Sequence, residues 1–327
     1  MRGPFYGWLL LGVWTGPGAP LLPAQRPDST PPHARAGAPR MPPGRTLRAE
    51  PAGFTDSLRQ PEAVVYDSTR DVYYVSNIEG FPTEKDNRGF IARVRPDGRR
   101  DSLRWIASGE RGVTLHAPKG MALGGDTLWV TDIDAVRGFE VTSGRQVASI
   151  DLAPQGAVFL NDLARTSDGT LYVTDTRVKP DSLGLLVPAG PARIYRIGAD
   201  RKPAVALESA RLKAANGIVW DRQRTRFVVV SMGSDTLFAW TPSDSGLTIL
   251  ATGPGLFDGV AVGPTGDVLV TSKATGSLHR VEGRRLGRLI ENLGDVADFD
   301  VDRKRKVVAI ALTGENRVVM YSLGTAR

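Results

Sequence analysis

The chain has 327 residues, 41% of them hydrophobic, so it can bury a large core as one big domain or two modest ones. The 37 glycines and 23 prolines, with few long apolar runs of helical period, favour an all-β protein with many tight turns. The net charge of +7 would suit an anionic partner, but the basic residues are scattered and no aromatics interleave them, which argues against nucleic-acid binding.

Residues 1–24 have the features of a secretory signal peptide. Met1 and Arg2 precede the apolar run PFYGWLLLGVW, and a small residue, Ala24, stands before Gln25. The apolar run is about ten residues long, whereas a membrane-spanning helix needs about 20. We therefore expect a secreted or periplasmic protein with no stable membrane span after cleavage. The chain has no cysteine, so lipid attachment at cysteine and disulfides are both excluded.

Residues 25–52 are rich in proline, arginine and alanine and have no periodicity. This composition predicts a disordered linker, and His33 within it carries no catalytic expectation. The folded domain is predicted to span residues 53–327.

One pattern recurs along this domain: a polar residue, a short apolar strand, a turn, and a second strand rich in β-branched and aromatic residues. A third strand follows in several copies, for example FIARV and ARIYRI. The six copies are PEAVVYDSTRDVYYVSN from Pro61, PKGMALGGDTLWVTD from Pro118, LNDLARTSDGTLYVTD from Leu160, ANGIVWDRQRTRFVVVS from Ala215, FDGVAVGPTGDVLVTS from Phe257 and VADFDVDRKRKVVAIAL from Val296.

Six copies at a spacing of roughly 45 residues match the size of four-stranded propeller blades. No copy shows the period of a helical solenoid, and an immunoglobulin-like sandwich does not explain sixfold recurrence. The sequence therefore predicts a six-bladed β-propeller with four-stranded antiparallel blades around a central channel.

The polar residue that opens each copy has a common place in this fold. The innermost strands of a propeller line the channel and all begin at one face, so their first polar positions form a ring at one mouth of the channel. We call this set the mouth ring; it comprises Glu62, Lys119, Asn161, Asn216, Asp258 and Ala297. Asp162 and Asp298 follow one place later, where the other copies carry glycine or alanine.

The second strand of each copy runs back to the same face, so its last residue is expected to form an outer rim around the mouth ring. The predicted rim comprises Asn77, Asp132, Asp175, Ser231 and Ser272. We expect Asp132 and Asp175 to contact a bound substrate.

Four members of the mouth ring are candidate metal ligands: Glu62, Asn161, Asn216 and Asp258. Two carboxylates and two amide oxygens suit a hard cation, and Ca²⁺ takes six to eight oxygen ligands. Zinc and copper are disfavoured, because the chain has three histidines and no cysteine. Asparagine and aspartate are also common turn residues, so each position taken alone is better explained as a loop or cap residue. Their shared place in four copies favours a divalent cation, with Ca²⁺ preferred.

From Pro61 to the C-terminus the chain resembles the SMP-30/gluconolactonase family of six-bladed propellers and, more distantly, the squid-type phosphotriesterases and paraoxonases. The motifs that carry the resemblance stand in the family's blade order: PEAVVYD, FLNDLARTSDGTLYVTD, ANGIVWD and FDGVAVGPTGDVLVTS. The resemblance implies a cation, usually Ca²⁺, held by Glu62, Asn161, Asn216 and Asp258. It also implies hydrolysis of lactones or related esters, with Asp258 as base or nucleophile.

Two positions depart from the family pattern. Phe159 stands where many gluconolactonases have an arginine that contacts the sugar, so a more apolar substrate becomes plausible at this position. Lys119 stands where paraoxonase-like relatives have a histidine. Lys119 could orient an anionic group, stabilise an oxyanion or weaken metal binding by repulsion; a salt bridge to Asp132 or Asp175 is the alternative. His116, on the loop before Lys119, is a candidate proton shuttle or an ordinary loop histidine, whereas His279 lies away from the mouth and is expected to be structural.

The leading hypothesis is thus a secreted Ca²⁺-dependent hydrolase of a small lactone or ester. The alternative is a non-catalytic propeller that binds a small ligand or a protein at the same mouth, because a fold alone does not decide function. Relatives similar to strictosidine synthase carry out other chemistry, but no residue here favours it. The sequence contains no G-x-S-x-G, H-E-x-x-H or G-x-x-x-x-G-K-[ST] motif.

Overall fold

The structure is a computed structural model that describes residues 47–244 and 246–325. The predicted signal peptide and residues 25–46 of the predicted linker lie outside the described residues. Within those residues the secondary structure is strand and turn, apart from one 3-10 turn, η1 (Ala153–Gln155). None of their helical segments is long and apolar enough to cross a bilayer.

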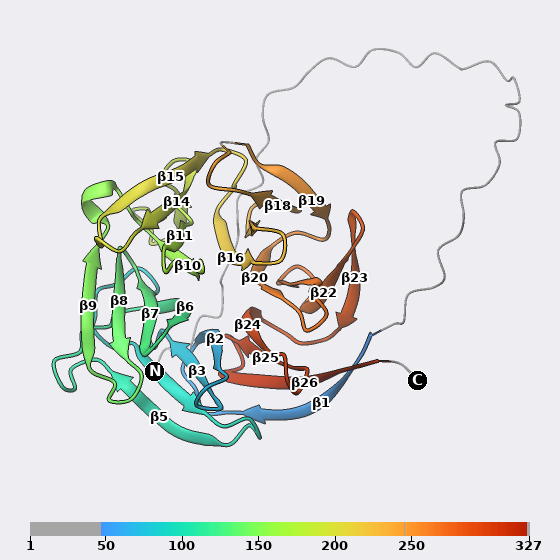
Figure 1. Ribbon diagram of the computed structural model, residues 1–327. Helices are drawn as coiled ribbons and strands as arrows, with labels where there is room; N and C mark the ends of the chain where they lie inside the picture. The colour runs from blue at the N-terminus through green and yellow to red at the C-terminus, as the bar shows by residue number, and fades with distance from the viewer. Residues whose placement is uncertain (1–46, 245, 326–327) are drawn as a thin grey trace, which may run out of the picture. The chain divides into compact units, whose positions relative to one another are not determined.

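Six four-stranded antiparallel sheets surround a common axis as the blades of a β-propeller (Figure 1). This confirms the predicted fold and blade count. The inner strands are β2 (Pro61–Asp67), β6 (Pro118–Gly124), β10 (Leu160–Arg165), β16 (Ala215–Asp221), β20 (Phe257–Val262) and β24 (Val296–Asp302). The second strands are β3 (Val72–Asn77), β7 (Thr127–Asp132), β11 (Leu171–Asp175), β17 (Arg226–Ser231), β21 (Val268–Ser272) and β25 (Val307–Leu312).

The outer half of each blade completes the four strands. The third strands are β4 (Phe90–Val94), β8 (Ala135–Glu140), β14 (Ala192–Ile197), β18 (Thr236–Trp240), β22 (Ser277–Glu282) and β26 (Arg317–Thr325). The outermost strands are β5 (Arg100–Ala107), β9 (Gln146–Asp151), β15 (Pro203–Ser209), β19 (Thr248–Thr252), β23 (Arg285–Ile290) and β1 (Leu47–Thr55). A separate hairpin of β12 (Val178–Pro180) and β13 (Leu186–Pro188) is inserted between β11 and β14.

The sixth blade is closed by the N-terminal strand. Its order is β24-β25-β26-β1, and the β1–β26 pairing runs from Leu47 opposite Thr325 to Thr55 opposite Val318. The first strand therefore begins at Leu47 rather than at residue 53. Pro51 is tolerated in this strand because the strand lies at the edge of its sheet, and the register shifts between Pro51 and Gly53. The two ends of the described chain are thus hydrogen-bonded to each other.

The middle strands are buried on both faces because each blade packs between two neighbours. All five residues of β11 and of β21 are buried, whereas the outermost strand β19 is largely exposed. This is why the second strands read as continuous apolar runs rather than as alternating ones. Between blades three and four the packing is aromatic: the ring centroids of Tyr172 and Phe227 are 4.6 Å apart, and those of Tyr172 and Trp240 are 5.8 Å apart.

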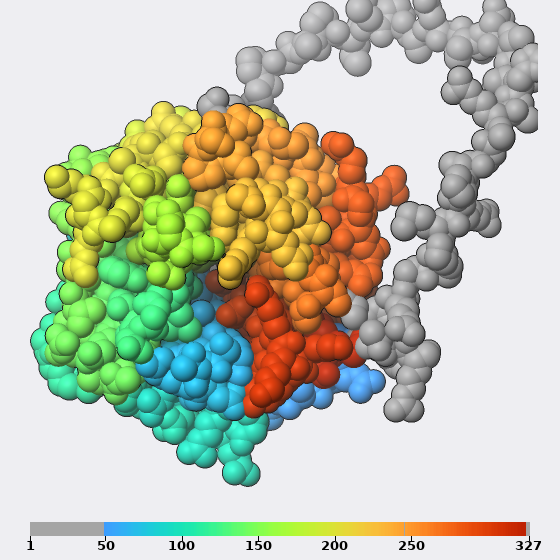
Figure 2. Space-filling model, viewed as in Figure 1, coloured from blue at the N-terminus to red at the C-terminus, as the bar shows by residue number. Residues whose placement is uncertain are grey.

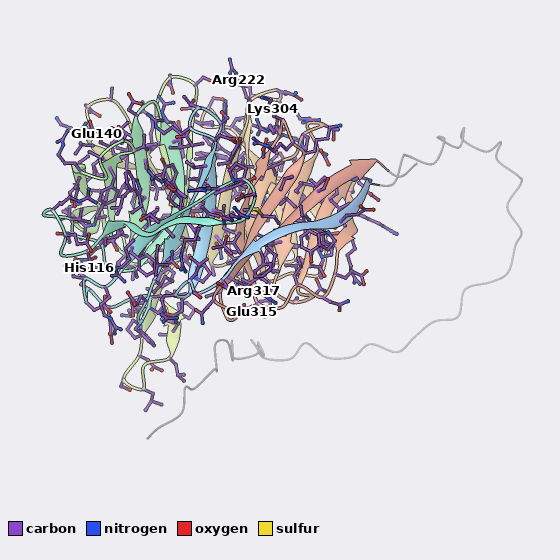
Figure 3. The ribbon with its side chains drawn as sticks, turned by 90° about the horizontal axis from the view of Figure 1, so that it is seen from below. His116, Glu140, Arg222, Lys304, Glu315 and Arg317 are labelled. Atoms are coloured by element: carbon purple, nitrogen blue, oxygen red, sulfur yellow. The ribbon has the colours of Figure 1, made fainter. Side chains whose placement is uncertain are left out.

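The inner strands all begin at one face, which we call the mouth face, and turn back at the opposite face, the turn face. His116, Glu315 and Arg317 lie on the mouth face, whereas Glu140, Arg222 and Lys304 lie on the turn face (Figure 3). Seen along the axis, the six blades meet around a central hollow (Figure 2). The mouth ring therefore lies at one end of the channel, as its position at the start of each inner strand requires.

Candidate functional site

Each inner strand contains a β-bulge at the mouth ring. In blade three, Leu160 pairs with Asp175 and Leu163 pairs with Val173, so Asn161 and Asp162 stand between the two pairs outside the regular register. The same shift occurs in the other five blades, between Pro61 and Val64, Pro118 and Met121, Ala215 and Ile218, Phe257 and Val260, and Val296 and Phe299. A bulge re-aims side chains and frees backbone groups from the ladder. The polar pair at the start of β10 thus belongs to a sixfold feature of the fold.

Threonine hydroxyls in the second strands tie these bulges together from blade to blade. Thr131 Oγ1 donates to the backbone oxygen of Asn161 at 2.5 Å, and Thr174 Oγ1 donates to that of Asn216 at 2.6 Å. Thr271 Oγ1 donates likewise to the backbone oxygen of Ala297 at 2.8 Å. Three buried hydroxyls therefore fix the backbone of mouth-ring positions in the next blade. Sequence reasoning missed them, although the repeated VTD and VTS endings carried the signal.

The two carboxylates of the mouth ring are close enough to influence each other. Burial raises the pKa of Glu62 well above its usual range, and repulsion from Asp258 adds to the effect, while Lys119 opposes it. Burial also raises the pKa of Asp258, against the opposing influence of Lys273 and of the Asn216 amide. Asp258 is 4% exposed, and its Oδ1 is a buried oxygen with no hydrogen-bond partner. An unpartnered buried carboxylate oxygen is costly, and a bound cation would relieve that cost.

The two amides of the mouth ring are buried and come from neighbouring blades. Asn161 Nδ2 donates to Thr176 Oγ1 at 3.2 Å, so the amide oxygen is not used in that contact. The Thr176 hydroxyl in turn donates to the backbone oxygen of Ala215 at 2.7 Å, directly before Asn216. Thr176 therefore links the backbone beside one candidate ligand to the side chain of the other.

Two lysines share the mouth with these groups. Lys119 is 1% exposed; its ammonium donates to the backbone oxygens of Pro82 and Ala117, both at 3.2 Å, and lies 4.2 Å from the centre of the Phe159 ring. Burial lowers the pKa of Lys119 to about 8, although the Glu62 and Asp132 carboxylates oppose this shift. Lys119 thus contacts backbone carbonyls rather than forming a salt bridge with Asp132 or Asp175.

The second lysine, Lys273, was not anticipated from the sequence. It follows the last residue of β21, and its ammonium lies 2.7 Å from Asp295 Oδ1 and 3.4 Å from Asp258 Oδ2. Its side chain is 17% exposed. The acidic neighbours raise its pKa, against the opposing effect of burial. Lys273 therefore stays charged beside the most buried carboxylate of the mouth ring.

Asp132 and Asp175, the predicted substrate contacts of the outer rim, are fully buried and hold the loops that lead into the inner strands. Asp132 Oδ1 accepts the backbone N–H groups of His116 and Ala117, and Oδ2 pairs with Arg137 at 2.5 Å. Asp175 Oδ1 accepts those of Phe159 and Arg177, at 2.9 and 3.0 Å. Their oxygens are occupied by these contacts, which corresponds to the cap role that aspartate commonly plays in turns.

His116 lies on the mouth face, and its side chain is also engaged. Its Nδ1 accepts the backbone N–H of Asn87 at 3.0 Å, which requires a neutral ring with the proton on Nε2. Burial lowers the pKa of His116, so the neutral form is favoured. His116 thereby connects the loop after β3 to the loop before β6.

The acidic residues one place beyond the mouth ring have a structural use. Asp162 accepts the backbone N–H groups of Leu163 and, across the blade boundary, Ile218, both at 2.7 Å. A Cβ at Gly120 would stand 2.3 Å from Asp162 Oδ1, and one at Gly259 would stand 2.2 Å from Asp298 Oδ1. Glycine therefore follows the mouth-ring residue in blades two and five because an aspartate of the next blade fills the space that a side chain would need.

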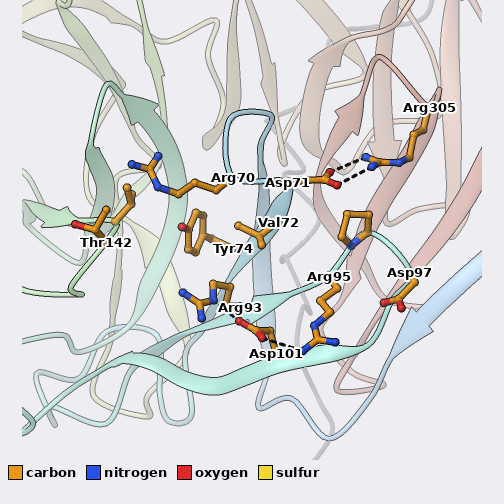
Figure 4. Close-up of a pocket in the computed structure, with 12 residues that line it drawn as sticks. Arg70, Asp71, Val72, Tyr74, Arg93, Arg95, Asp97, Asp101, Thr142 and Arg305 are labelled. Carbon is orange, nitrogen blue, oxygen red and sulfur yellow. Dashed lines mark hydrogen bonds and ion pairs between the residues drawn. The ribbon is translucent and has the colours of Figure 1, made fainter.

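A cleft of about 740 Å³ lies on the turn face, away from the mouth ring (Figure 4). Its lining includes several arginines, but these are neutralised by neighbouring aspartates: Arg305 pairs with Asp71 at 2.7 Å, and Arg93 pairs with Asp101 at 2.5 Å. Among the residues that line this cleft, the Tyr74 hydroxyl is the one buried polar side-chain atom without a hydrogen-bond partner. We therefore assign the candidate site to the mouth.

The donors at the mouth fit a hard cation better than a soft one. Two carboxylates and two amides offer oxygen only, and Asp258 Oδ1 has no competing partner. No cluster of three or more histidine, cysteine, aspartate or glutamate side chains suited to a metal occurs within residues 47–244 and 246–325. A cation at the mouth would therefore depend on the asparagines Asn161 and Asn216 as well as on Glu62 and Asp258.

The propeller is similar to several solved enzyme structures. A gluconolactonase from Xanthomonas campestris is 19% identical, with 85% of this chain and 90% of that chain covered and a TM-score of 0.62. A luciferin-regenerating enzyme is 12% identical, with coverages of 84% and 97% and a TM-score of 0.61. A virginiamycin B lyase from Staphylococcus aureus is 11% identical, with coverages of 85% and 99% and a TM-score of 0.57.

No protein-family model and no curated protein matches the sequence. The structural neighbours nevertheless include gluconolactonase and luciferin-regenerating enzyme propellers, in agreement with the resemblance found in the blade motifs. At these identities the likeness establishes the fold.

Proposed function

We propose that the protein is a metal-dependent hydrolase of lactones or related esters, acting at the mouth of the channel. The observation that carries the proposal is the buried Asp258 Oδ1 without a partner, in a ring that also holds Glu62, Asn161 and Asn216. The similarity to a gluconolactonase propeller supports the substrate class.

In this proposal Glu62, Asn161, Asn216 and Asp258 hold a divalent cation, with Ca²⁺ favoured by the all-oxygen donor set. When bound, such a cation polarises a carbonyl group and stabilises negative charge on its oxygen. Asp258 takes a proton from the water that attacks the carbonyl carbon, and returns it to the alkoxide oxygen that leaves when the ester C–O bond breaks. Lys273 stabilises the ionised form of this carboxylate, since the ammonium is 3.4 Å from Asp258 Oδ2.

The groups around the mouth favour a substrate with an apolar part. Phe159 is 7% exposed and holds the Lys119 ammonium against its ring, while the same ammonium is engaged by two backbone carbonyls. Two of the three N–H donors of Lys119 are thereby engaged and the side chain is 1% exposed, so little of the ammonium is open to a sugar acid. We therefore favour simple alkyl or aryl lactones and esters over polyhydroxylated ones.

We further propose that the protein works outside the cytoplasm. The support is the sequence of residues 1–24, with its short charged start and apolar run. Release of the mature protein into a periplasmic or culture-supernatant fraction, with a new N-terminus near Gln25, would bear this out. A full-length N-terminus retained in the cytoplasm would contradict it.

The test of the catalytic proposal is turnover of a panel of γ- and δ-lactones and aryl esters by protein loaded with Ca²⁺. Removal of the cation with a chelator and the substitution Asp258→Asn are each expected to lower the rate at least about 100-fold, the range expected when a general base is lost. Asp126→Asn, which changes an exposed carboxylate away from the mouth, serves as the matched control. Full activity in chelator, or in D258N, would refute the mechanism.

One observation favours a second function. Lys273 beside Asp258 and Lys119 near Glu62 place positive charge from the chain itself at the mouth. Such a mouth could bind a small ligand without chemistry. Ligand-dependent stabilisation of the protein, with no turnover across the whole panel in the presence of Ca²⁺, Mg²⁺ or Mn²⁺, would select this binding function over hydrolysis.

A further inference from the structure

Lys273 is held in position by contacts on both its backbone and its side chain. Its backbone N–H donates to the backbone oxygen of Leu256 at 2.9 Å, which places the residue beside the segment that leads into β20. Its ammonium reaches across the mouth of blade five to Asp258 of the same blade and to Asp295, which precedes β24 of the next blade. Since the side chain is 17% exposed, this ammonium belongs to the site rather than to the surface.

The two carboxylates that Lys273 contacts differ in surroundings. Asp258 is buried, and only its Oδ2 faces the ammonium, at 3.4 Å, while Oδ1 is left without a partner. Asp295 has a side chain that is 41% exposed, and its Oδ1 lies closer to the ammonium, at 2.7 Å. The ammonium is therefore shared between a buried carboxylate in the mouth ring and an exposed one beside it.

This sharing has an electrostatic consequence for any cation at the mouth. A divalent cation on Asp258 Oδ1 would stand on the same carboxylate as the Lys273 ammonium, and two like charges in a partly buried site repel strongly. Movement of the ammonium towards Asp295 would reduce the repulsion, because Asp295 already provides the shorter contact. Asp295 is thus a second carboxylate with which the Lys273 ammonium can pair when a cation binds to Asp258.

We propose that the Lys273 ammonium acts as a counter-ion of Asp258 that competes with divalent cations and so sets the affinity of the mouth for them. Asp295 is the alternative partner of the ammonium. This inference rests on the proposed metal site and adds a residue that determines its affinity. Loss of the lysine charge tightens cation binding, and loss of the Asp295 charge weakens it. A positioning role for Lys273 in folding alone would not produce these opposite effects.

The test is direct calcium binding by calorimetry on chelator-stripped, full-length protein at fixed ionic strength. Lys273→Met is expected to bind Ca²⁺ at least tenfold more tightly than the original protein, and Asp295→Asn at least threefold more weakly. Lys273→Arg keeps the charge and is expected to stay within about threefold of the original affinity. Lys304→Met makes the same chemical change on the turn face and is expected to leave the affinity unchanged (Figure 3).

The possible results separate this inference from the proposed function. Calcium binding by the original protein with equal or weaker binding by K273M would overturn the counter-ion role and leave the metal site standing. No calcium binding by any of the variants would overturn the metal site and the counter-ion role together. If K273M does not reach the circular dichroism spectrum of the original protein, Lys273→Gln takes its place with the same expected direction.

Discussion

Thr174 offers the sharpest test of how the fold supports the mouth ring. Its side chain is fully buried; Oγ1 donates to the backbone oxygen of Asn216 at 2.6 Å and accepts the backbone N–H of Asp162 at 3.0 Å. Thr174→Val has nearly the same shape and removes both hydrogen bonds. Each of the two buried backbone groups left without a partner costs about 1–3 kcal/mol, so we expect a loss of about 2–6 kcal/mol in the free energy of unfolding.

A domain of this length loses about 2 °C in melting temperature per kcal/mol, so the expected fall is about 4–12 °C. Thermal and urea unfolding of T174V would measure it, with Thr174→Ser as the variant that keeps the hydroxyl and is expected to lose about 1 kcal/mol for the missing methyl group. Thr142→Val, an exposed change on the turn face (Figure 4), is the matched control. A melting temperature of T174V within 1 °C of the original would refute the idea that these hydroxyls join the blades.

Three further predictions concern the site and its surroundings. Thr176→Val removes the acceptor of Asn161 Nδ2 and is expected to weaken Ca²⁺ binding severalfold, as measured by calorimetry, while Thr142→Val leaves it unchanged. Gly259→Ala puts a Cβ 2.2 Å from Asp298 Oδ1 and 2.7 Å from the Asp298 Cα. We expect the free energy of unfolding, measured in urea, to fall by about 1–3 kcal/mol. An unchanged urea midpoint would contradict the tight packing of blades five and six. Burial and, to a smaller extent, the positive charge of Arg288 lower the pKa of His279. His279 therefore binds a proton more readily in the unfolded chain than in the folded one. The free energy of unfolding that depends on neutral His279 is fully present above about pH 6.5 and is lost as the pH falls below it. His279→Gln should therefore lose less stability than the original protein between pH 7.5 and 5.5, measured by urea unfolding. Equal losses in both proteins would refute this.

The blade count and the third strands could be predicted because each copy repeats the same local chemistry. The fourth strands could not, because an outermost strand such as β5 faces solvent on one side and is under weaker constraint from burial. The closing strand β1 was assigned to a linker for a related reason. Its residues LRAEPAGFT contain proline and glycine, and its partner β26 lies at the other end of the chain, so no local pattern marks the pairing.

The mouth ring could be located from sequence because the start of an inner strand is a fixed place in every blade. The roles of neighbouring residues were harder to predict, since they depend on which way a side chain turns. Asp132 and Asp175 turn back to the loop backbone, where aspartate finds N–H groups close at hand, instead of facing the channel. Lys273 lies just beyond the expected rim, and the pairing of Phe257 with Ser272 within blade five brings its ammonium to Asp258.

The pairing of β1 with β26 also governs the order in which the molecule can be assembled. Among the described strands, β1 is synthesised first, yet its hydrogen-bonding partner β26 is synthesised last. Five blades can form as the chain grows, but the circle stays open until β26 has been made. A chain that stops short of Arg317 would leave a gap beside blade one and leave β1 unpaired, so β26 is a condition for a sealed molecule.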